Sequence, residues 1–381
     1  MEQLEISSEW VSRFRRNVRR WYKTRGRDLP WVGQRDPYAV WVREIMLQQT
    51  TVTAVVPYLG RFLDRFPTVQ VLAAAELDEV LRAWEGLGYY SRARNLHKAA
   101  RMIVHEWGGL WRETAGELEA LPGVGRYTAG AIASFAFDQP SAIVEANTAR
   151  LYARLMALES DLTQSASRRQ LWSLADRLVP RVRPGEFNQA LIDLGATVCG
   201  ARARCRECPV RSCCRALELG VVQSIPPPTL RRDPTDLFEL MVAIRRGSDV
   251  LLVQHAEGSR WGGLWGFPML ERNEEVECSG VQERRLVEEA RRWGCGVEFS
   301  RWLPAFRHRV TRFRLHLQPV ELMWQDGDWD AAAPGEWVSV DDLASRPLSV
   351  AGRRVARAVQ LSQPFTASDF GEWDCRQQRV G

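Results

Sequence analysis

The chain has 381 residues, of which 45% are hydrophobic and 26% charged, a balance typical of soluble globular proteins with two or three domains. No apolar run approaches the roughly 20 residues of a membrane-spanning helix, and residues 1–10 carry glutamates rather than the apolar core of a secretory signal. The net charge of +5 is compatible with a nucleic-acid partner without requiring one, and we expect a cytoplasmic protein with no membrane contact.

The first 220 residues predict an all-α region. Apolar side chains recur at spacings of three and four along residues 10–22, which indicates an amphipathic helix. Its other face carries six cations, namely Arg13, Arg15, Arg16, Arg19, Arg20 and Lys23. Such a face is either simply solvated or turned towards phosphate groups. Further helical patterns cover residues 39–50, 77–84, 92–107, 113–120, 128–135, 149–158 and 167–179.

Two acids stand out by their surroundings. Glu44 lies among Trp, Ile, Met and Leu, so it is either exposed on a polar stripe or partly buried. Burial would raise its pKa towards the range of a general acid. Glu145 directly precedes an expected helix, whose positive end would keep it ionised. The structural alternative is a helix cap, for which Asn147 is the better residue.

Residues 121–130 (LPGVGRYTAG) have the pattern of a helix–hairpin–helix motif. Gly123 and Gly125, on either side of Val124, allow a tight turn that bulky residues would obstruct. Such a turn directs backbone N–H groups at a helix N-terminus towards a phosphate oxygen, which anchors DNA without selecting a sequence. The structural alternative is an ordinary turn between two helices.

Five of the eight cysteines lie between residues 199 and 214, and such clustering indicates metal ligands rather than disulfides. The set Cys199, Cys205, Cys208 and Cys214 suits either a [4Fe–4S] cluster or zinc. The tight spacing directly after a helical region favours iron–sulfur. We choose Cys214 over the adjacent Cys213 because it restores the five-residue spacing after Cys208.

Composition changes after residue 222. Residues 223–235 contain four prolines, which predict a stiff, extended linker. Alternation along 238–244, a turn at 246–249 and a returning segment at 250–254 predict a hairpin. Further strands are expected at 312–322 and 337–340, and helices at 284–293 and 350–361. The second half is therefore a small α+β domain, followed by a loose tail at 363–381.

Several segments together resemble MutY-type adenine DNA glycosylases. The segments are 27–31 (RDLPW), 36–38 (DPY), 44–50 (EIMLQQT), 86–96 (GLGYYSRARNL), the hairpin at 121–130 and 187–195 (FNQALIDLG). The resemblance covers essentially all of the first 220 residues. A looser one, carried by 264–268 (LWGFP) and 306–308 (FRH), relates the second half to the NUDIX-like domain of the same family.

The resemblance implies a multidomain protein. An all-α helix–hairpin–helix glycosylase domain with a [4Fe–4S] loop would span 1–222, with a linker at 223–235. An α+β NUDIX-like domain at 236–362 would inspect the base opposite adenine, and 363–381 would form a tail. Double-stranded DNA containing A:8-oxoguanine or A:G mispairs is the implied partner of a nucleoid-associated monomer.

Roles for individual residues follow from the same resemblance. Glu44 would protonate the adenine and activate water, while Glu145 would stabilise the positive charge that develops on the sugar. Tyr127 and Asn147 would support the sugar-side chemistry. Wedge residues would offset the energy of base flipping. The implied DNA-contacting residues are Gln49 and Tyr89 as wedges, Trp31, Leu47 and Gln189 in the base pocket, and Gly123, Val124 and Gly125 in the phosphate-binding turn.

The chain departs from the family pattern at several positions. Glu145 replaces an aspartate that glycine usually follows, so we expect reduced chemistry or a compensating backbone shift. Val32 occupies a position where a polar residue near the adenine is common. Val310, Thr311 and Arg312 replace the Phe-Ser-His loop that recognises 8-oxoguanine. Arg312 could still bind a guanine edge. Five residues rather than six separate the first two cysteines.

Two activities are not expected. Tyr127 occupies the position of the lysine that forms a Schiff base in strand-cleaving relatives, and Lys23 and Lys98 are distant in sequence, so lyase activity is not expected. Residues 285–289 (RLVEE) lack the full acidic set of a NUDIX hydrolase box, so pyrophosphate hydrolysis is not expected. The alternatives to adenine excision are altered target-base or opposite-base choice, or a catalytically weak lesion-binding protein.

Overall fold

The computed structural model describes residues 6–228, 233–275, 278–330 and 334–361. Backbone contacts divide the chain into two compact units, one formed by 1–75 with 92–230 and the other by 76–91 with 231–381. Segment 76–91 therefore packs with the second unit, although its neighbours in sequence belong to the first. No helix in the described part of the chain is long and apolar enough to cross a membrane. The tail at 363–381 lies outside the described residues.

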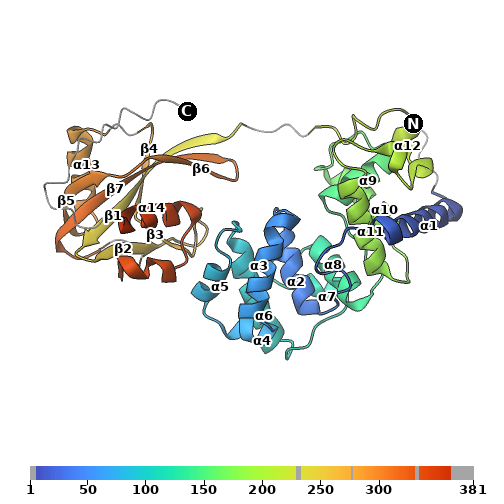
Figure 1. Cartoon of the computed structure of the whole chain (residues 1–381), viewed down its shortest axis with the longest axis horizontal. Coiled ribbons are helices and arrows are strands. Elements are labelled where there is room, and N and C mark those ends of the chain that lie inside the picture. The colour runs from blue at the N-terminus through green and yellow to red at the C-terminus, as the bar shows by residue number, and fades with distance from the viewer. Residues whose placement is uncertain (1–5, 229–232, 276–277, 331–333, 362–381) are drawn as a thin grey trace. The chain divides into compact units, whose positions relative to one another are not determined.

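The first unit consists of helices, as the sequence predicts (Figure 1). They are α1 (Ser8–Arg25), α2 (Pro37–Leu47), α3 (Val52–Arg65), α4 (Val69–Ala74), α6 (Ser91–His105), α7 (Ala115–Leu118), α8 (Arg126–Phe137), α9 (Ala146–Met156), α10 (Ser165–Leu178), α11 (Pro184–Thr197) and α12 (Arg215–Glu218), with 3-10 turns η1 (Cys205–Glu207) and η2 (Arg211–Cys213). The sequence patterns did not single out α3, α4, α11 or α12. Pro57 inside α3 interrupts the expected signal.

Helix α2 begins and ends at identifiable residues. The Asp36 side chain caps its N-terminus by accepting bonds from the backbone of Tyr38 and Ala39. The helix ends at Leu47 rather than at residue 50 as expected, because Gln49 adopts a left-handed conformation with φ of 59°. Nine of its eleven residues are buried, including Glu44. An acid on this helix is therefore placed inside the unit and not on its surface.

Helices α8, α9 and α11 pack closely together. The small residues that the sequence places after the hairpin are all buried, and a Cβ on Gly130 would overlap the carbonyl oxygen of Ala142. A Cβ on Gly195 of α11 would lie 2.7 Å from the carbonyl oxygen of Asn147. Glycine at these two positions lets α8 and α11 approach the segment that begins α9. The start of α9 is thereby held between two helices.

The second unit contains a mixed sheet with α5 (Leu77–Ala83), α13 (Gly280–Arg291), η3 (Val340–Ser345) and α14 (Val350–Gln360). The strands are β1 (Thr235–Arg246), β2 (Asp249–Gln254), β3 (Trp265–Gly266), β4 (Met269–Arg272), β5 (Cys295–Trp302), β6 (Phe306–Val310), β7 (Phe313–Gly327) and β8 (Gly335–Ser339). Within the described residues the main strand order is β3-β2-β1-β7-β5, with β4 beside β1, β6 beside β7 and β8 beside β2. The predicted β1–β2 hairpin and α+β class are confirmed.

Strand β1 is central and is buried on both faces. Met241 and Ala243 pack into the apolar cluster that includes α14, whereas Leu240, Val242 and Ile244 pack into the cluster that includes α13. The alternation in the sequence therefore separates two cores rather than a core from solvent. Figure 1 shows the long strands β1 and β7 with these helices against them. The short strands β3, β4, β5 and β6 were not predicted.

Candidate active site and nucleic-acid interface

Glu44 is buried and holds two partners at once. Its side chain is 4% exposed, and its Oε2 accepts a hydrogen bond of 2.8 Å from the hydroxyl of Tyr127 on α8. Its Oε1 accepts bonds of 2.9 Å from Nε and 2.8 Å from Nη2 of Arg43, the preceding residue of α2. Of the two positions weighed from the sequence, the buried one is observed. Arg43 was not foreseen.

Arg43 is itself enclosed by aromatic rings. Its guanidinium lies 5.7 Å from the ring centroid of Trp31 and 5.1 Å from that of Phe135. A buried cation stacked on rings and paired with a carboxylate is fully satisfied only while the carboxylate is present. Trp31, which we expect in the base pocket, and Glu44 are thus linked through one guanidinium.

Tyr127 lies within the fields of both acids. Loss of contact with water holds the pKa of Tyr127 well above its usual value, and the charges of Glu44 and Glu145 raise it further. The phenol therefore stays protonated and donates its hydrogen bond to Glu44. Both carboxylates therefore lie within electrostatic range of this one hydroxyl, although they are far apart in sequence.

Glu145 caps helix α9. Its Oε1 accepts from the backbone N–H of Thr148 at 2.8 Å, and its Oε2 accepts from the backbone N–H of Asn147 at 2.9 Å. The hydroxyl of Thr148 completes a capping box by accepting from the backbone N–H of Glu145 at 2.9 Å. The expectation that Asn147 is the better cap is therefore wrong, because the longer Glu145 side chain folds back to reach both amides.

Burial shifts the pKa of Glu145. Desolvation raises the pKa of this carboxyl from its usual 4.5, and the bonds from Asn147 and Thr148 and the charge of Arg150 only partly oppose that effect. The expectation that the helix dipole keeps Glu145 ionised considered only contributions that lower the pKa and left out desolvation. A carboxylate held in this way is a high-energy anion, which a sugar cation beside it would stabilise.

A stability measurement checks the raised pKa of Glu145. With the folded pKa above 4.5, Glu145 contributes stability that is fully present below pH 4.5 and is lost as pH rises through the raised value. We expect the melting temperature of Glu145→Gln, relative to that of the unaltered protein, to increase as the pH is raised from about 4 to about 7.5. An unchanged difference over this range would contradict the raised pKa. Glu113→Gln, at an exposed position, is the matched control.

A chain of hydrogen bonds leads from Glu145 to the cysteine loop. Asn147 Nδ2 donates to Glu145 Oε2 at 3.1 Å, and Asn147 Oδ1 accepts from Arg150 Nη2 at 2.9 Å. The same Arg150 donates through Nη2 to the carbonyl of Gly195 and through Nε to that of Cys199, both at 2.8 Å. Asn147 is thereby held in one orientation between the acid and the loop.

Asp193 of α11, whose side chain is fully buried, holds residues from two segments of the first unit. Arg27 donates to its two oxygens at 2.8 Å from the backbone and 2.9 Å from Nε. Gln189 Nε2 donates to Oδ1 at 2.9 Å. The amide of Gln189 is oriented by this bond, so its oxygen points away from Asp193. The segment carrying Trp31 is tied to α11 through Arg27.

The hairpin before α8 leaves the N-terminus of that helix without a side-chain cap. Gly123 has φ of 78°, which favours glycine, and a Cβ there would lie 2.8 Å from the Cβ of Asn95. Gly125 is the N-cap of α8 and offers no side chain to the first-turn amides. These amides, together with the positive end of the helix dipole, fit a phosphate oxygen.

Gln49 is presented by a turn that Arg92 holds. Arg92 Nη1 donates to the carbonyls of Ile45 at 2.9 Å and Met46 at 3.0 Å, and also to that of Gln48. The exposed Gln49 then follows in a left-handed conformation. Non-glycine residues in that conformation are strained and cluster at functional sites. Sequence reasoning missed Arg92, since nothing in its neighbours indicates that it is buried.

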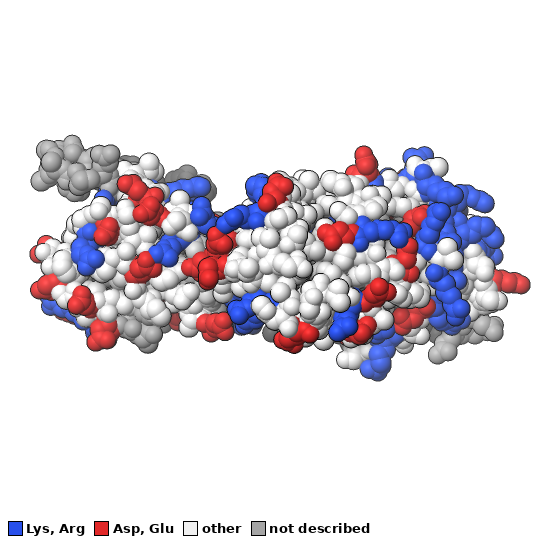
Figure 2. Space-filling model, turned by 90° about the horizontal axis from the view of Figure 1, so that it is seen from below, with Lys and Arg blue, Asp and Glu red and all other residues white. Residues whose placement is uncertain are grey.

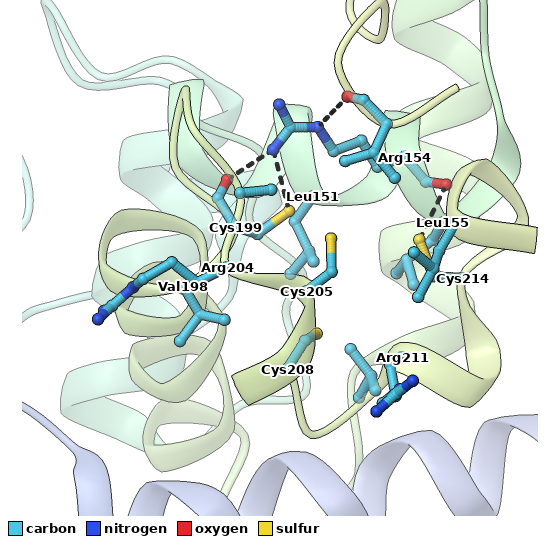
Figure 3. Close-up of a pocket in the computed structure, with 14 residues that line it drawn as sticks. Leu151, Arg154, Leu155, Val198, Cys199, Arg204, Cys205, Cys208, Arg211 and Cys214 are labelled. Carbon is cyan, nitrogen blue, oxygen red and sulfur yellow. Dashed lines mark hydrogen bonds between the residues drawn. The ribbon is translucent and has the colours of Figure 1, made fainter. Parts of the chain in front are cut away.

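Four of the clustered cysteines line one cavity. Cys199, Cys205, Cys208 and Cys214 surround it together with apolar side chains of α9 and the loop (Figure 3). Burial raises the pKa of the Cys208 thiol to about 12, and the charges of the three other thiols add to the effect. Each sulfur therefore lies within the field of the others. Thiols placed so closely without water favour a cationic partner.

The fifth cysteine of the loop is placed differently. Cys213 is 3% exposed and belongs to the apolar core of the first unit, and it does not line the cavity. Arg154, which is also buried, donates through Nη1 to the carbonyl of Cys199 at 3.1 Å and to its Sγ at 3.3 Å. The geometry thus favours Cys214 over Cys213 as a ligand, as the spacing argument does.

In the second unit, Thr311 and Arg312 form the exposed tip of the β6–β7 hairpin. Val310 pairs with Phe313, so the turn has two residues and β7 starts one residue later than expected. Thr311 has φ of 52°, which is unusual for a β-branched residue. The Arg312 guanidinium stacks on the Phe313 ring at 4.9 Å. Both residues are available to a ligand.

Tyr89 lies in segment 76–91 of the second unit and is 47% exposed, with φ of 47°. Glu85 of this segment accepts two bonds from Arg353 of α14, at 2.8 and 2.7 Å. Asp78 accepts a bond of 2.9 Å from the indole of Trp265. The segment that carries the expected wedge is therefore anchored to the sheet unit.

Known proteins resemble both units. The model of the HhH-GPD superfamily base excision DNA repair protein matches residues 42–177, and a NUDIX domain model matches 240–358. The adenine DNA glycosylases of Mus musculus and Homo sapiens are each 36% identical, over 92% and 93% of the chain and 78% and 76% of their own lengths. That of Buchnera aphidicola subsp. Acyrthosiphon pisum is 30% identical over 81% of the chain and 85% of its own length.

The chain belongs to the adenine DNA glycosylase family. It is a DNA N-glycosylase of base excision repair, and the resemblance inferred from the motifs is confirmed. The structure of a thermostable thymine-DNA glycosylase superposes with a TM-score of 0.51 at 28% identity, over 56% of the chain and 100% of that protein. The helical glycosylase domain of this adenine DNA glycosylase thus has a solved counterpart.

The interactions that sequence analysis missed in this chain are mostly made by arginines, of which Arg43, Arg92 and Arg154 are buried and Arg150 is half-buried. Arg43, Arg92, Arg150 and Arg154 each hold a carbonyl or carboxylate of the site. Arginine is usually exposed, so no periodic signal separates these residues from the many on the surface. Arg43 directly precedes the 44–50 segment and Arg92 lies within 86–96, which was the one available hint.

Proposed function

We propose that this glycosylase removes adenine mispaired with 8-oxoguanine or guanine, with Glu44 as the general acid and Glu145 as the stabilising anion. The observation that supports it most is that Glu44 of α2 accepts a bond from the Tyr127 hydroxyl, while the charge of Glu145, the N-cap of α9, also acts on that phenol. Cutting an N-glycosidic bond needs a proton on the leaving base and a negative group near the sugar.

Glu44, whose carboxylate pairs with Arg43, would take up a proton from solvent and deliver it to the flipped adenine. Its Oε1 is held by Arg43 and its Oε2 by Tyr127, so the carboxyl is oriented before substrate arrives. Tyr127 remains protonated and can both donate and accept, so it can follow a proton on Oε2 by rotating its hydroxyl. After the base leaves, the Glu44 carboxylate is the base that activates water.

Glu145 would face the cationic sugar. Its two oxygens are held by the first amides of α9, and Asn147 adds a third bond. An anion that is desolvated but rigidly held interacts strongly with charge that develops only in the transition state. We expect Trp31, Leu47 and Gln189 to line the base pocket, with Gln49 and Tyr89 as wedges and the 123–125 amides on phosphate.

The enzyme would act without strand cleavage. Tyr127 occupies the place at which a lysine could attack the sugar, and a phenol whose pKa is held well above its usual value is a poor nucleophile there. The product would therefore carry an intact backbone at the abasic site. We propose that the protein acts as a monomer.

The cysteine cavity fits a [4Fe–4S] cluster. Among the described residues no three Cys, His, Asp or Glu side chains converge on a single-ion site, whereas four thiols line one largely apolar cavity. Zinc would need all four sulfurs close to one point, while a four-iron cluster gives each thiolate its own iron. The group would be structural, holding the arginine-rich loop 199–214 in shape. The proposed ligands are Cys199, Cys205, Cys208 and Cys214.

Two adjacent variants test this ligand set. Cys214→Ser is expected to remove most of the visible absorption of the purified protein, because one iron loses its thiolate. Cys213→Ser is expected to keep that absorption, since its side chain packs in the core away from the cavity. The reverse pattern would show that Cys213 is the ligand. Zinc by metal analysis with no visible absorption would reject the cluster.

The deciding experiment is single-turnover adenine release from A:8-oxoguanine and A:G duplexes at enzyme excess. We expect release from both, because Arg312 can donate to O6, the acceptor that the major-groove edges of guanine and 8-oxoguanine share. Arg312→Ala is expected to slow release on both, whereas Arg309→Ala, an exposed arginine of β6, is the control. Absence of adenine release from both duplexes would overturn the proposal.

A further inference from the structure

Helix α1 carries a straight row of cations on its exposed face. Arg13, Arg16, Arg20 and Lys23 recur at intervals of three, four and three residues, so they lie along one line of the helix. All four are exposed, and the face opposite them is buried through Trp10, Phe14 and Val18. We call these four residues the cationic row.

The row is not neutralised by the protein. None of its four side chains has an ion pair or a hydrogen bond with any residue of the described ranges, and Glu9 is the one acid in α1. Like charges three and four residues apart destabilise a helix. The row therefore lowers the stability of α1 itself, which is expected of a surface that binds an anion.

Arg15 and Arg19, beside the row, fasten α1 to the end of α10. Arg15 donates to the carbonyls of Arg177, Leu178 and Val179 at 2.9 to 3.0 Å, and Arg19 donates to that of Val182. These bonds place the exposed Arg181 and Arg183 next to α1.

The same end of α10 also touches the phosphate-binding hairpin. Arg126, which follows Gly125, stacks on Trp172 at 3.9 Å and pairs with Asp176 at 3.1 Å. The hairpin helix and α1 are therefore neighbours across a few residues of α10. Figure 2 shows Arg and Lys side chains gathered in a band at the right-hand end of the view, the end at which α1 lies in Figure 1.

We infer that the cationic row binds the phosphate backbone of the duplex that flanks the lesion, extending the contact made by the hairpin. The row covers eleven residues of helix, about 15 Å from first to last, a length over which one DNA strand presents about four phosphates. Four cations match that number. The contact would be independent of sequence and would lengthen the footprint of the enzyme beyond the flipped base.

The test is a comparison of duplex lengths. Affinity of the full-length protein is measured for mispaired duplexes of about 12 and about 30 base pairs, with the extension on either side, at several salt concentrations. The variant Arg13→Gln/Arg16→Gln/Arg20→Gln is set against Arg284→Gln/Arg285→Gln/Arg291→Gln, which removes the same charge from exposed positions of α13. Adenine release from the short duplex is followed in parallel, so that a failure of the proposed activity is seen separately.

For the long duplex, we expect the α1 variant to lose about tenfold or more in affinity, with a salt dependence shallower by about 2 to 3 in log–log slope. The α13 variant should keep both. If the α1 and α13 variants show the same difference in affinity between the long and the short duplex, the inference is overturned. That result is also the one expected if the row binds an acidic protein instead of DNA. If the triple variant has a lowered melting temperature, Arg20→Gln alone is used, and it should make the log–log salt dependence shallower by about 1. An unchanged salt dependence in Arg20→Gln would also overturn the inference.

Discussion

Glu44→Gln is expected to lower the single-turnover rate of adenine release about a thousandfold or more, because the amide cannot give up a proton to the base or accept one from water. Binding to mispaired DNA should be retained, since Glu44 is buried and the hairpin amides are unaffected. Glu113→Gln, on the surface, is the control. A rate within tenfold of the unaltered enzyme would remove Glu44 from the chemistry.

Glu44→Gln is also expected to reduce the stability of the protein, separately from its effect on the chemistry. Arg43 would keep its charge inside the protein but lose the carboxylate that accepts two of its bonds. The variant must therefore be assayed below its melting transition. Tyr127→Phe offers a comparison that removes one bond to Glu44 without removing the acid, and a much smaller loss of rate is expected there.

Arg43→Met is expected to destabilise the protein by about 3 to 5 kcal/mol, because the Glu44 anion would remain buried without its cation. The double variant Arg43→Met/Glu44→Gln should be less destabilised than the sum of the two single changes, since no unpaired charge is left. Chemical denaturation of the four proteins measures the coupling. Arg35→Met, at a pair that is largely exposed, is the control and should change stability little.

Strict additivity of the Arg43 and Glu44 changes would contradict this picture. It would mean that the buried pair contributes no more than two independent side chains, in conflict with side chains that are each 4% exposed and 2.8 Å apart. Strong coupling would show that the residue before the proposed acid holds that acid in place, and does not merely fill space between Trp31 and Phe135.

The parts of the site that the sequence predicted are those with their own local signal. The hairpin depends on two glycines and a helix start, and the cysteine loop on spacing, so both are visible in a single segment. Burial of Glu44 could be anticipated from its apolar neighbours on α2. These elements carry their physical cause within about ten residues.

The remaining parts depend on contacts between distant segments. Nothing near Glu145 shows that burial outweighs the helix dipole, because the burial comes from α8 and α11 packing around the start of α9. Arg150 likewise finds its partners at Gly195 and Cys199. In the sheet, β5 and β6 were missed, since their burial is partial and their alternation weak.

The anchoring of segment 76–91 to the sheet has a consequence for dividing this protein into pieces. A fragment ending near residue 230 would keep every helix of the first unit but would leave Glu85 and Asp78 without Arg353 and Trp265. Tyr89 would then be displayed from a segment stripped of its support. Such a fragment is therefore not one intact unit. A loss of activity in it would be caused partly by segment 76–91, which lies far before the point of truncation.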